Sequence, residues 1–313
     1  MLRGMHVRRL VDRPILTAAS HASLAEHGHG NLNGPSLIRV PGWVPGALGR
    51  YYLYFAHHQG TFIRLAYADE LTGPWRVHEP GTLRLAQTPF GGHIASPDVH
   101  VDHEAKRIVM YYHGCCSPAG SPWGQSTCVA FSRDGLVFES QRRFLCPSYL
   151  RVFAWRGVRW GVVMPGDVHR MEDGWSGMSP CLASLRSGLA ADASAAVTND
   201  CKPRHFAAMV RDDVLHLVYS RAGDCPEHLL HARVPWHDDV TRWTAQPPAS
   251  LLLPERDWEG ADCPLEASRG GAVHQRVRQL RDPALFEDDG RTFVVYSVAG
   301  EAGLAIAEVV WDR

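Results

Sequence analysis

Short apolar runs separated by turn residues recur along the whole chain. The clearest unit is the last one, residues 281–309, where the apolar run 283–287 ends in Asp288-Asp289-Gly290. A β-branched and aromatic run, 292–298, follows, and after a glycine-containing break comes 304–309. Runs of about four to eight residues bounded by Asp and Gly clusters are typical of antiparallel strands. The pattern therefore predicts three consecutive strands in this unit.

The same strand pattern occurs four more times upstream. The five units lie near residues 31–80, 93–140, 146–185, 202–245 and 280–310. Repeats of three or four strands at such spacing are typical of propeller blades. We therefore predict an all-β, five-bladed β-propeller that forms a single domain over residues 1–313. An early strand near 13–18 is expected to join the last blade and close the ring, which removes exposed sheet edges.

Composition argues against several classes of partner. The 313 residues are 45% hydrophobic and 21% charged with a net charge of −1, so neither nucleic acid nor an anionic membrane is indicated as a partner. No apolar run reaches the ~18–20 residues that span a bilayer, and the N-terminal segment lacks the apolar core of a secretory signal. The eight cysteines show no CxxC spacing. Together these features favour reduced thiols and a cytoplasmic location.

Strand direction sorts the polar residues between the two mouths of the predicted propeller. The first strand of each blade lines the channel and the second runs antiparallel to it, so first-strand starts and second-strand ends share one mouth. That mouth is expected to receive Asn33, His58, His93, Asp98, Arg151, Arg204, His205, Arg281, Asp282 and Glu301. Carboxylates, histidines and arginines that converge on a concave surface are the default hypothesis for an active site. The long segment 246–279 is expected to cover one mouth.

Several motifs resemble those of five-bladed glycoside hydrolases of families 43, 62, 32, 68 and 117. They are SPDVHVD, YYLYFAHH and RDPALFEDDG, with AYADELTGPW closing the first unit, and the resemblance covers most of residues 30–310. Family 43 implies an aspartate base on blade one, a pKa-tuning aspartate on blade two and a glutamate acid on blade three. Only the blade-two aspartate has a counterpart, Asp98, since blade one reads Asn33-Gly34-Pro35 and blade three Ser148-Tyr149-Leu150-Arg151. Family 117, which works on anhydro-sugars with a histidine suggested as acid, is the better resemblance, and it makes His205 or His58 a candidate acid.

The expected reaction is hydrolysis of small oligosaccharides, including anhydro- or otherwise unusual ones. Glycoside hydrolysis normally uses one protonated and one ionised group on either side of the scissile bond. We expect Asp98 to be the general base, Glu301 the proton donor, and Asp282 an orienting or pKa-tuning carboxylate that Arg281 keeps ionised. His205 is a further catalytic candidate. The predicted substrate-binding residues are Asn33, His58, His93, Arg151, Arg204 and Arg281.

Two alternatives stay open at this point. A phosphorylase needs only one acid, because phosphate replaces the activated water, and the mouth rich in arginine and histidine fits such an enzyme. A sugar-binding propeller without catalysis fits the missing acids, although three acids retained at one mouth argue against it. No ligand spacing is diagnostic of a metal, so no cofactor is predicted. A structural divalent cation or water in the central channel, near His57, His58 and His93, is the alternative.

Overall fold

Five antiparallel β-sheets surround a central channel in the computed structural model, which describes residues 5–25, 30–118, 120–191 and 202–311. Each sheet is one blade of four or five strands. The predicted all-β, five-bladed propeller is therefore confirmed.

The blades follow one another along the chain. The first consists of β3 (Asn33–Arg39), β4 (Tyr51–Ala56), β5 (Phe62–Ala68) and β6 (Arg76–Arg84). The second consists of β7 (Ile94–Asp102), β8 (Arg107–Cys115), β9 (Gln125–Ser132), β10 (Glu139–Ser140) and β11 (Cys146–Pro147). The third consists of β12 (Arg151–Trp155), β13 (Val158–Val163), β14 (Asp167–Glu172), β15 (Gly177–Met178) and β16 (Ala183–Ser184). The fourth consists of β17 (Lys202–Arg211), β18 (Val214–Ala222), β19 (Leu229–Pro235) and β20 (Ala249–Leu252). The fifth combines β21 (Arg281–Asp288), β22 (Arg291–Val298) and β23 (Gly303–Trp311) with β1 (Met5–Arg9) and β2 (Leu16–Thr17).

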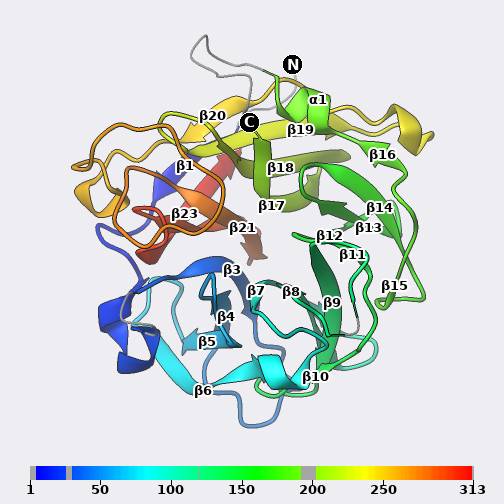
Figure 1. Cartoon of the computed structure of the whole chain (residues 1–313), viewed down its shortest axis with the longest axis horizontal. Coiled ribbons are helices and arrows are strands. Elements are labelled where there is room, and N and C mark those ends of the chain that lie inside the picture. Colours follow the sequence, from blue (N-terminus) through cyan, green and yellow to red (C-terminus); the bar gives the residue numbers. More distant parts are fainter. Residues whose placement is uncertain (1–4, 26–29, 119, 192–201, 312–313) are drawn as a thin grey trace.

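The innermost strands β3, β7, β12, β17 and β21 face one another around the channel (Figure 1). The second strands are buried on both faces, because each blade packs between two neighbours; every residue of β4, for example, is buried. This is why these strands read as continuous apolar runs rather than as alternating ones. The helix α1 (Arg186–Leu189) is a single turn between the third and fourth blades. No helix in the described ranges is long and apolar enough to cross a membrane.

The N-terminal segment closes the ring. β1 pairs with β23 over its whole length, from Met5 opposite Trp311 to Arg9 opposite Ala307. The strand predicted near 13–18 is present only as the two residues of β2, which pair with residues 303–304. Most of the closing contact therefore comes from further upstream than predicted, because the MHVRR sequence of β1 is only half-buried and carries a weak apolar signal.

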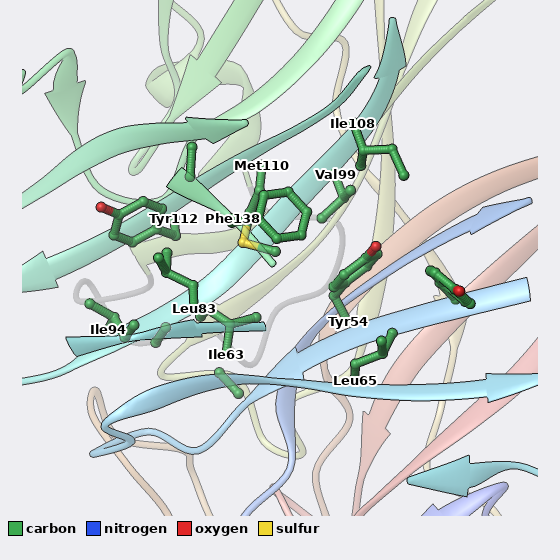
Figure 2. Close-up of a cluster of buried hydrophobic side chains, with 14 of the residues drawn as sticks. Tyr54, Ile63, Leu65, Leu83, Ile94, Val99, Ile108, Met110, Tyr112 and Phe138 are labelled. Carbon is green, nitrogen blue, oxygen red and sulfur yellow. The ribbon is translucent and has the colours of Figure 1, made fainter. Parts of the chain in front are cut away.

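A hydrophobic cluster fills each gap between neighbouring blades. Figure 2 shows the cluster between the first and second blades, with Tyr54, Ile63, Leu65, Leu83, Ile94, Val99, Ile108, Met110, Tyr112 and Phe138 labelled. Four corresponding clusters occupy the other blade interfaces. Burying one large apolar side chain contributes roughly 1.5–3 kcal/mol. This packing fixes the blades against one another, so the innermost strands that carry the channel side chains are held in place.

Candidate active site

A cavity of about 340 Å³ lies at the mouth of the channel where the innermost strands begin. Each blade contributes to its wall from the start of its innermost strand or just before it: Asn33, Ser96, Tyr149, His205 and Asp282. Six of the ten predicted site residues line this cavity, namely Asn33, His58, His93, Arg204, His205 and Asp282. Two further lining residues, His113 and Tyr149, are also expected at this mouth from strand direction, but the sequence assigns them neither a catalytic nor a binding role.

A β-bulge recurs at the start of four innermost strands. The register shifts fall at residues 33–36, 95–98, 204–207 and 281–284. Each bulge places one residue in the left-handed region: Gly34 (φ 53°), Ser96 (φ 49°), His205 (φ 56°) and Asp282 (φ 50°). Such backbone conformations are unfavourable for residues other than glycine and are concentrated at functional sites. The three that are not glycine all line the cavity.

Asp98 and Arg151 lie further along the channel, in the wall of a second cavity of about 320 Å³. Asp98 Oδ2 accepts a hydrogen bond of 2.8 Å from the backbone N–H of Val152 and lies 2.8 Å from His100 Nε2. Burial raises the pKa of Asp98, but His100 and Arg151 outweigh burial and lower it. The prediction that Asp98 shares the mouth with the other acids is therefore wrong. The bulge in β7 presents Ser96 to the mouth and directs Asp98 to the next blade.

Asp282 is the one carboxylate among the described residues that lines the mouth cavity. Its Oδ1 accepts a hydrogen bond of 3.3 Å from the Tyr149 hydroxyl and lies 3.6 Å from His205 Nδ1. Its Oδ2 is buried and has no hydrogen-bond partner within the described part of the chain. Burial and the charge of Glu301 raise the pKa of Asp282 to about 7. The opposing effect of Arg281 is smaller, so the prediction that Arg281 keeps this group ionised is wrong. The carboxyl group exchanges its proton near neutral pH.

Glu301 lies behind the cavity wall and is only 1% exposed. It accepts hydrogen bonds from Asn31 Nδ2 and from Arg281 Nη1 (3.2 Å), and its Oε1 lies 3.5 Å from His58 Nδ1. Burial raises the pKa of Glu301, but the hydrogen bond and charge of His58, and then the charge of Arg281, lower it to about 2. Glu301 therefore stays ionised, and its predicted role as proton donor is wrong. The turn that carries it looks solvated in the sequence, but residues 277–279 cover it through backbone hydrogen bonds to residues 299–300.

Four histidines in the described ranges line the cavity, and they fall into two groups. Burial opposes a positive charge on His58, but the hydrogen bond and charge of Glu301 outweigh burial and raise the pKa of His58. Burial lowers the pKa of the other three, His93, His113 and His205, and for the last two well below the ordinary value. At neutral pH the cavity therefore presents one imidazole that readily carries a proton and three neutral ones.

A buried ion network supports the cavity from outside. Glu227 is fully buried and accepts hydrogen bonds from Arg204 Nε (2.9 Å) and Ser220 Oγ (2.7 Å). Its Oε2 also lies 3.2 Å from Arg281 Nε. The charges of both arginines are thus compensated by acids. The sequence did not point to Glu227, because it follows β18 in a turn with Gly, Asp and Pro, a setting in which acids are usually solvated.

Residues 268–273 form a roof over the cavity, and Gly270 and Gly271 line it. Three backbone carbonyls of this segment accept hydrogen bonds from the buried polar layer: Arg269 from Arg204 (3.3 Å), Gly271 from Arg281 (3.2 Å) and Val273 from Asn31 (3.3 Å). The segment 246–279 therefore does cover the mouth, although its first part forms β20 of the fourth blade. No three His, Cys, Asp or Glu side chains in the described ranges are arranged to hold a metal ion. A cation or water in the channel stays a prediction.

One relative of similar length comes from a giant virus. The chain is 34% identical over 307 residues to "Uncharacterized protein R118" of Acanthamoeba polyphaga mimivirus, and the alignment covers 90% of this chain and 85% of the viral protein. The chain belongs to the family of this mimivirus protein. No protein-family model matches the chain. Membership of the mimivirus protein's family assigns no activity, since the relative is itself uncharacterized.

This chain shares its fold with glycoside hydrolases of family 43. The family 43 protein BlXynB from Bacillus licheniformis superposes with a TM-score of 0.62 at 14% identity; the match covers 97% of this chain and 54% of that one, so this chain spans about half its length. The β-xylosidase/α-arabinofuranosidase CoXyl43 from a compost metagenome, solved with xylotriose, gives a TM-score of 0.59 at 12% identity over 96% and 94% of the two chains. The endo-arabinase of Bacteroides thetaiotaomicron gives 0.60 at 14% over 90% and 94%. Identities this low show the fold alone.

Proposed function

We propose that this chain is a glycosidase that hydrolyses the terminal unit of small oligosaccharides in the mouth cavity. One observation carries the proposal: two groups with raised pKa values, Asp282 and His58, line the same cavity. The charge on His58 lowers the pKa of Asp282, and Asp282 raises the pKa of His58. Each therefore influences the protonation of the other. Perturbed titratable groups in a cleft favour acid–base catalysis, and the likeness in fold to family 43 supports a sugar substrate by analogy.

The active protonation state has an imidazolium at His58 and a carboxylate at Asp282. His58 donates its proton to the glycosidic oxygen as the bond from that oxygen to the anomeric carbon breaks. Water attacks the anomeric carbon and gives a proton to Asp282, and exchange with solvent then restores the pair. Glu301, 3.5 Å from His58 Nδ1, stabilises the imidazolium and leaves the other ring nitrogen for the substrate. The reaction thus keeps the usual donor and acceptor pair, with a histidine in place of one carboxylate.

The cavity suits one sugar unit at a chain end. Its volume of about 340 Å³ lies near the lower end of the ~300–1,000 Å³ typical of small-molecule sites. Its wall combines imidazoles with the apolar side chains of Ala95, Met164 and Pro165. A sugar presents both hydroxyl groups and an apolar C–H face, so it can contact both kinds of surface. The roof at residues 268–273 limits the length of chain that can enter.

The ion network favours hydrolysis over phosphorolysis. A phosphorylase requires cationic groups that are available to inorganic phosphate. Of the three arginines expected at the mouth, Arg204 and Arg281 are instead bonded to Glu227 and Glu301, and Arg151 lies further along the channel. An incoming phosphate would have to compete with these buried carboxylates.

The test is turnover of nitrophenyl α- and β-glycosides and of short oligosaccharides, in buffer with and without phosphate. Wild-type protein is expected to hydrolyse at least one of them without phosphate. Asp282→Asn and His58→Asn should each lower kcat/KM by roughly 100-fold or more. Asp98→Asn, a matched acid-to-amide change in the second cavity further along the channel, should keep most of the activity. Cleavage that depends on phosphate, or sugar binding without any turnover, would refute the proposal.

A further inference from the structure

Two adjacent cysteines adjoin the cavity at His93. Cys115 Sγ lies 3.2 Å from Cys116 Sγ and 3.2 Å from His93 Nδ1. Cys116 is exposed and Cys115 is partly buried, while His93 lines the cavity. Solvent, two sulfur atoms and a cavity imidazole thus form one continuous series of contacts.

Both sulfur atoms lie on the same side of the backbone, over Gly92. A Cβ atom on Gly92 would come within 2.6 Å of Cys115 Sγ and 3.0 Å of Cys116 Sγ. Adjacent residues of an extended chain point to opposite faces, but the left-handed backbone of Cys116 (φ 58°) ends this alternation where β8 ends. The local fold therefore brings two neighbouring thiols together, and glycine at position 92 leaves room for them.

We propose that Cys115 and Cys116 are an oxidation site at which the two thiols form a vicinal disulfide, and that oxidation releases His93 from its sulfur partner. The sulfur atoms have to approach by about 1.2 Å, from 3.2 Å to the ~2.0 Å of a disulfide bond. The co-reactant is a small disulfide of the oxidised glutathione type.

The exchange proceeds in two steps through a mixed disulfide. The exposed thiol of Cys116 loses its proton and attacks one sulfur of the small disulfide, which releases one thiolate. Cys115 then loses its proton and attacks the Cys116 sulfur, which releases the second thiolate. The two protein thiols are oxidised, two small thiols are formed, and the two protons end on them. Burial and the neighbouring Cys116 raise the pKa of the Cys115 thiol, so Cys116 is the thiol that reacts first.

Oxidation changes the wall of the cavity. The Cys115 sulfur has no S–H group in the disulfide and moves towards Cys116, so His93 Nδ1 loses its 3.2 Å contact. The imidazole is then free to change its orientation or its tautomer. The Cα atoms of adjacent residues are only about 3.8 Å apart, less than the ~4.4–6.8 Å usual for disulfides. The bond is therefore expected to be easily reduced, and the change reversible.

Mass spectrometry of full-length protein equilibrated in glutathione buffers of increasing oxidation tests the site. After acid quenching and alkylation, the tryptic peptide of residues 108–133 is expected to lose two hydrogen atoms and to stay unalkylated at both positions until dithiothreitol is added. Cys116→Ser should abolish this change. Cys225→Ser, which removes another exposed cysteine, should leave it intact. A stable mixed disulfide on Cys116, or two free thiols in the most oxidising buffer, would overturn the proposal.

Histidine NMR reads out the second half of the proposal without any substrate. The ring signals of His93, assigned with a His93→Gln variant, should shift on oxidation of the wild type and not of Cys116→Ser. An unchanged His93 signal in the oxidised protein would refute the link to the cavity.

An effect on turnover rests on the proposed function, whereas the thiol chemistry does not. If the chain hydrolyses a sugar, oxidation should change kcat/KM in the wild type and not in Cys116→Ser. A protein that forms the disulfide and shifts His93 but cleaves no sugar would refute only the glycosidase. An active enzyme whose two thiols never pair would refute only the oxidation site.

Discussion

Replacing Asp282 with asparagine should make the folded protein more stable, relative to the wild type, at neutral pH than at pH 4. Folding moves this carboxyl group from water, where its pKa is 3.8, into a buried position beside Glu301, where the pKa rises to about 7. At about 1.4 kcal/mol per pH unit, this rise corresponds to about 4 kcal/mol. The folded chain binds the proton more tightly than the unfolded chain. The contribution to stability is therefore complete below about pH 4, is lost as the pH rises towards 7, and is constant above that.

Asparagine does not titrate, so the comparison reports the titration of Asp282 together with the effect of its charge on Glu301 and His58. The free energy of unfolding of Asp282→Asn, minus that of the wild type, should increase by about 4 kcal/mol between pH 4 and pH 8. The difference at pH 4 itself is set by local packing and does not enter this change. The variant should at the same time lose activity, because a group that is useful for proton transfer is unfavourable for folding.

Urea unfolding followed by tryptophan fluorescence at several pH values provides the measurement. Asp98→Asn is the matched control, since the pKa of that carboxyl group is lowered in the folded chain. Its stability relative to the wild type should therefore change mainly below about pH 4 and stay nearly level between pH 4 and pH 8. If the Asp282→Asn and wild-type stabilities ran parallel from pH 4 to pH 8, the carboxyl group would not be perturbed and the catalytic assignment would fail.

Three further predictions concern the surroundings of the cavity and the fourth blade. Tyr149→Phe removes the hydrogen bond to Asp282 Oδ1, so it should raise the pKa of Asp282 further. The acidic limb of the pH–activity profile, where Asp282 loses its proton, should then move to higher pH; an unmoved acidic limb would contradict this. Glu227→Gln leaves two buried arginines undercompensated and should lower the free energy of unfolding by about 3–5 kcal/mol in urea titrations. His216 and His231 stack with a nitrogen–nitrogen distance of 2.9 Å, and burial is the largest cause that lowers their pKa values to about 4 and about 3. Stability should therefore fall as the pH drops below about 6.5, and His231→Gln should reduce that slope when unfolding is measured from pH 7 to pH 4.

The blades could be predicted from the sequence because their second strands are buried on both faces and therefore consist of uninterrupted apolar runs. β4 and β22 are read directly from YYLYFA and RTFVVYSV, and the turn residues between the runs mark their ends. The closing strand β1 could not be found in this way. Only alternate residues of MHVRR are half-buried, and its place in the sheet is determined by pairing with β23 at the other end of the chain.

The site was harder to predict, because a bulge changes which residue faces the channel mouth. A period of two along β7 gives no sign of the extra residue at 95–98, so Asp98 was placed at the mouth where Ser96 lies. Burial of the acids depends in the same way on distant segments. Glu227 and Glu301 stand in turns that look solvated, and both are buried by the chain that precedes β21.

The bulges also explain why the mouth holds a single carboxylate among the residues that the structure describes. The same left-handed position recurs in four blades, where it is occupied by Gly34, Ser96, His205 and Asp282. The backbone geometry is thus shared, and the side chain at this position differs from blade to blade. Strain alone does not exclude an acid at position 34, since Asp282 adopts nearly the same φ. Space does exclude it: a Cβ atom on Gly34 would come within 2.6 Å of the Ser96 Cα and 2.9 Å of its Cβ. A carboxylate at position 34 of the first blade would require the backbone at position 96 to move. The second proton-transfer group of the proposed mechanism is therefore His58, which follows the end of β4 and contacts Glu301.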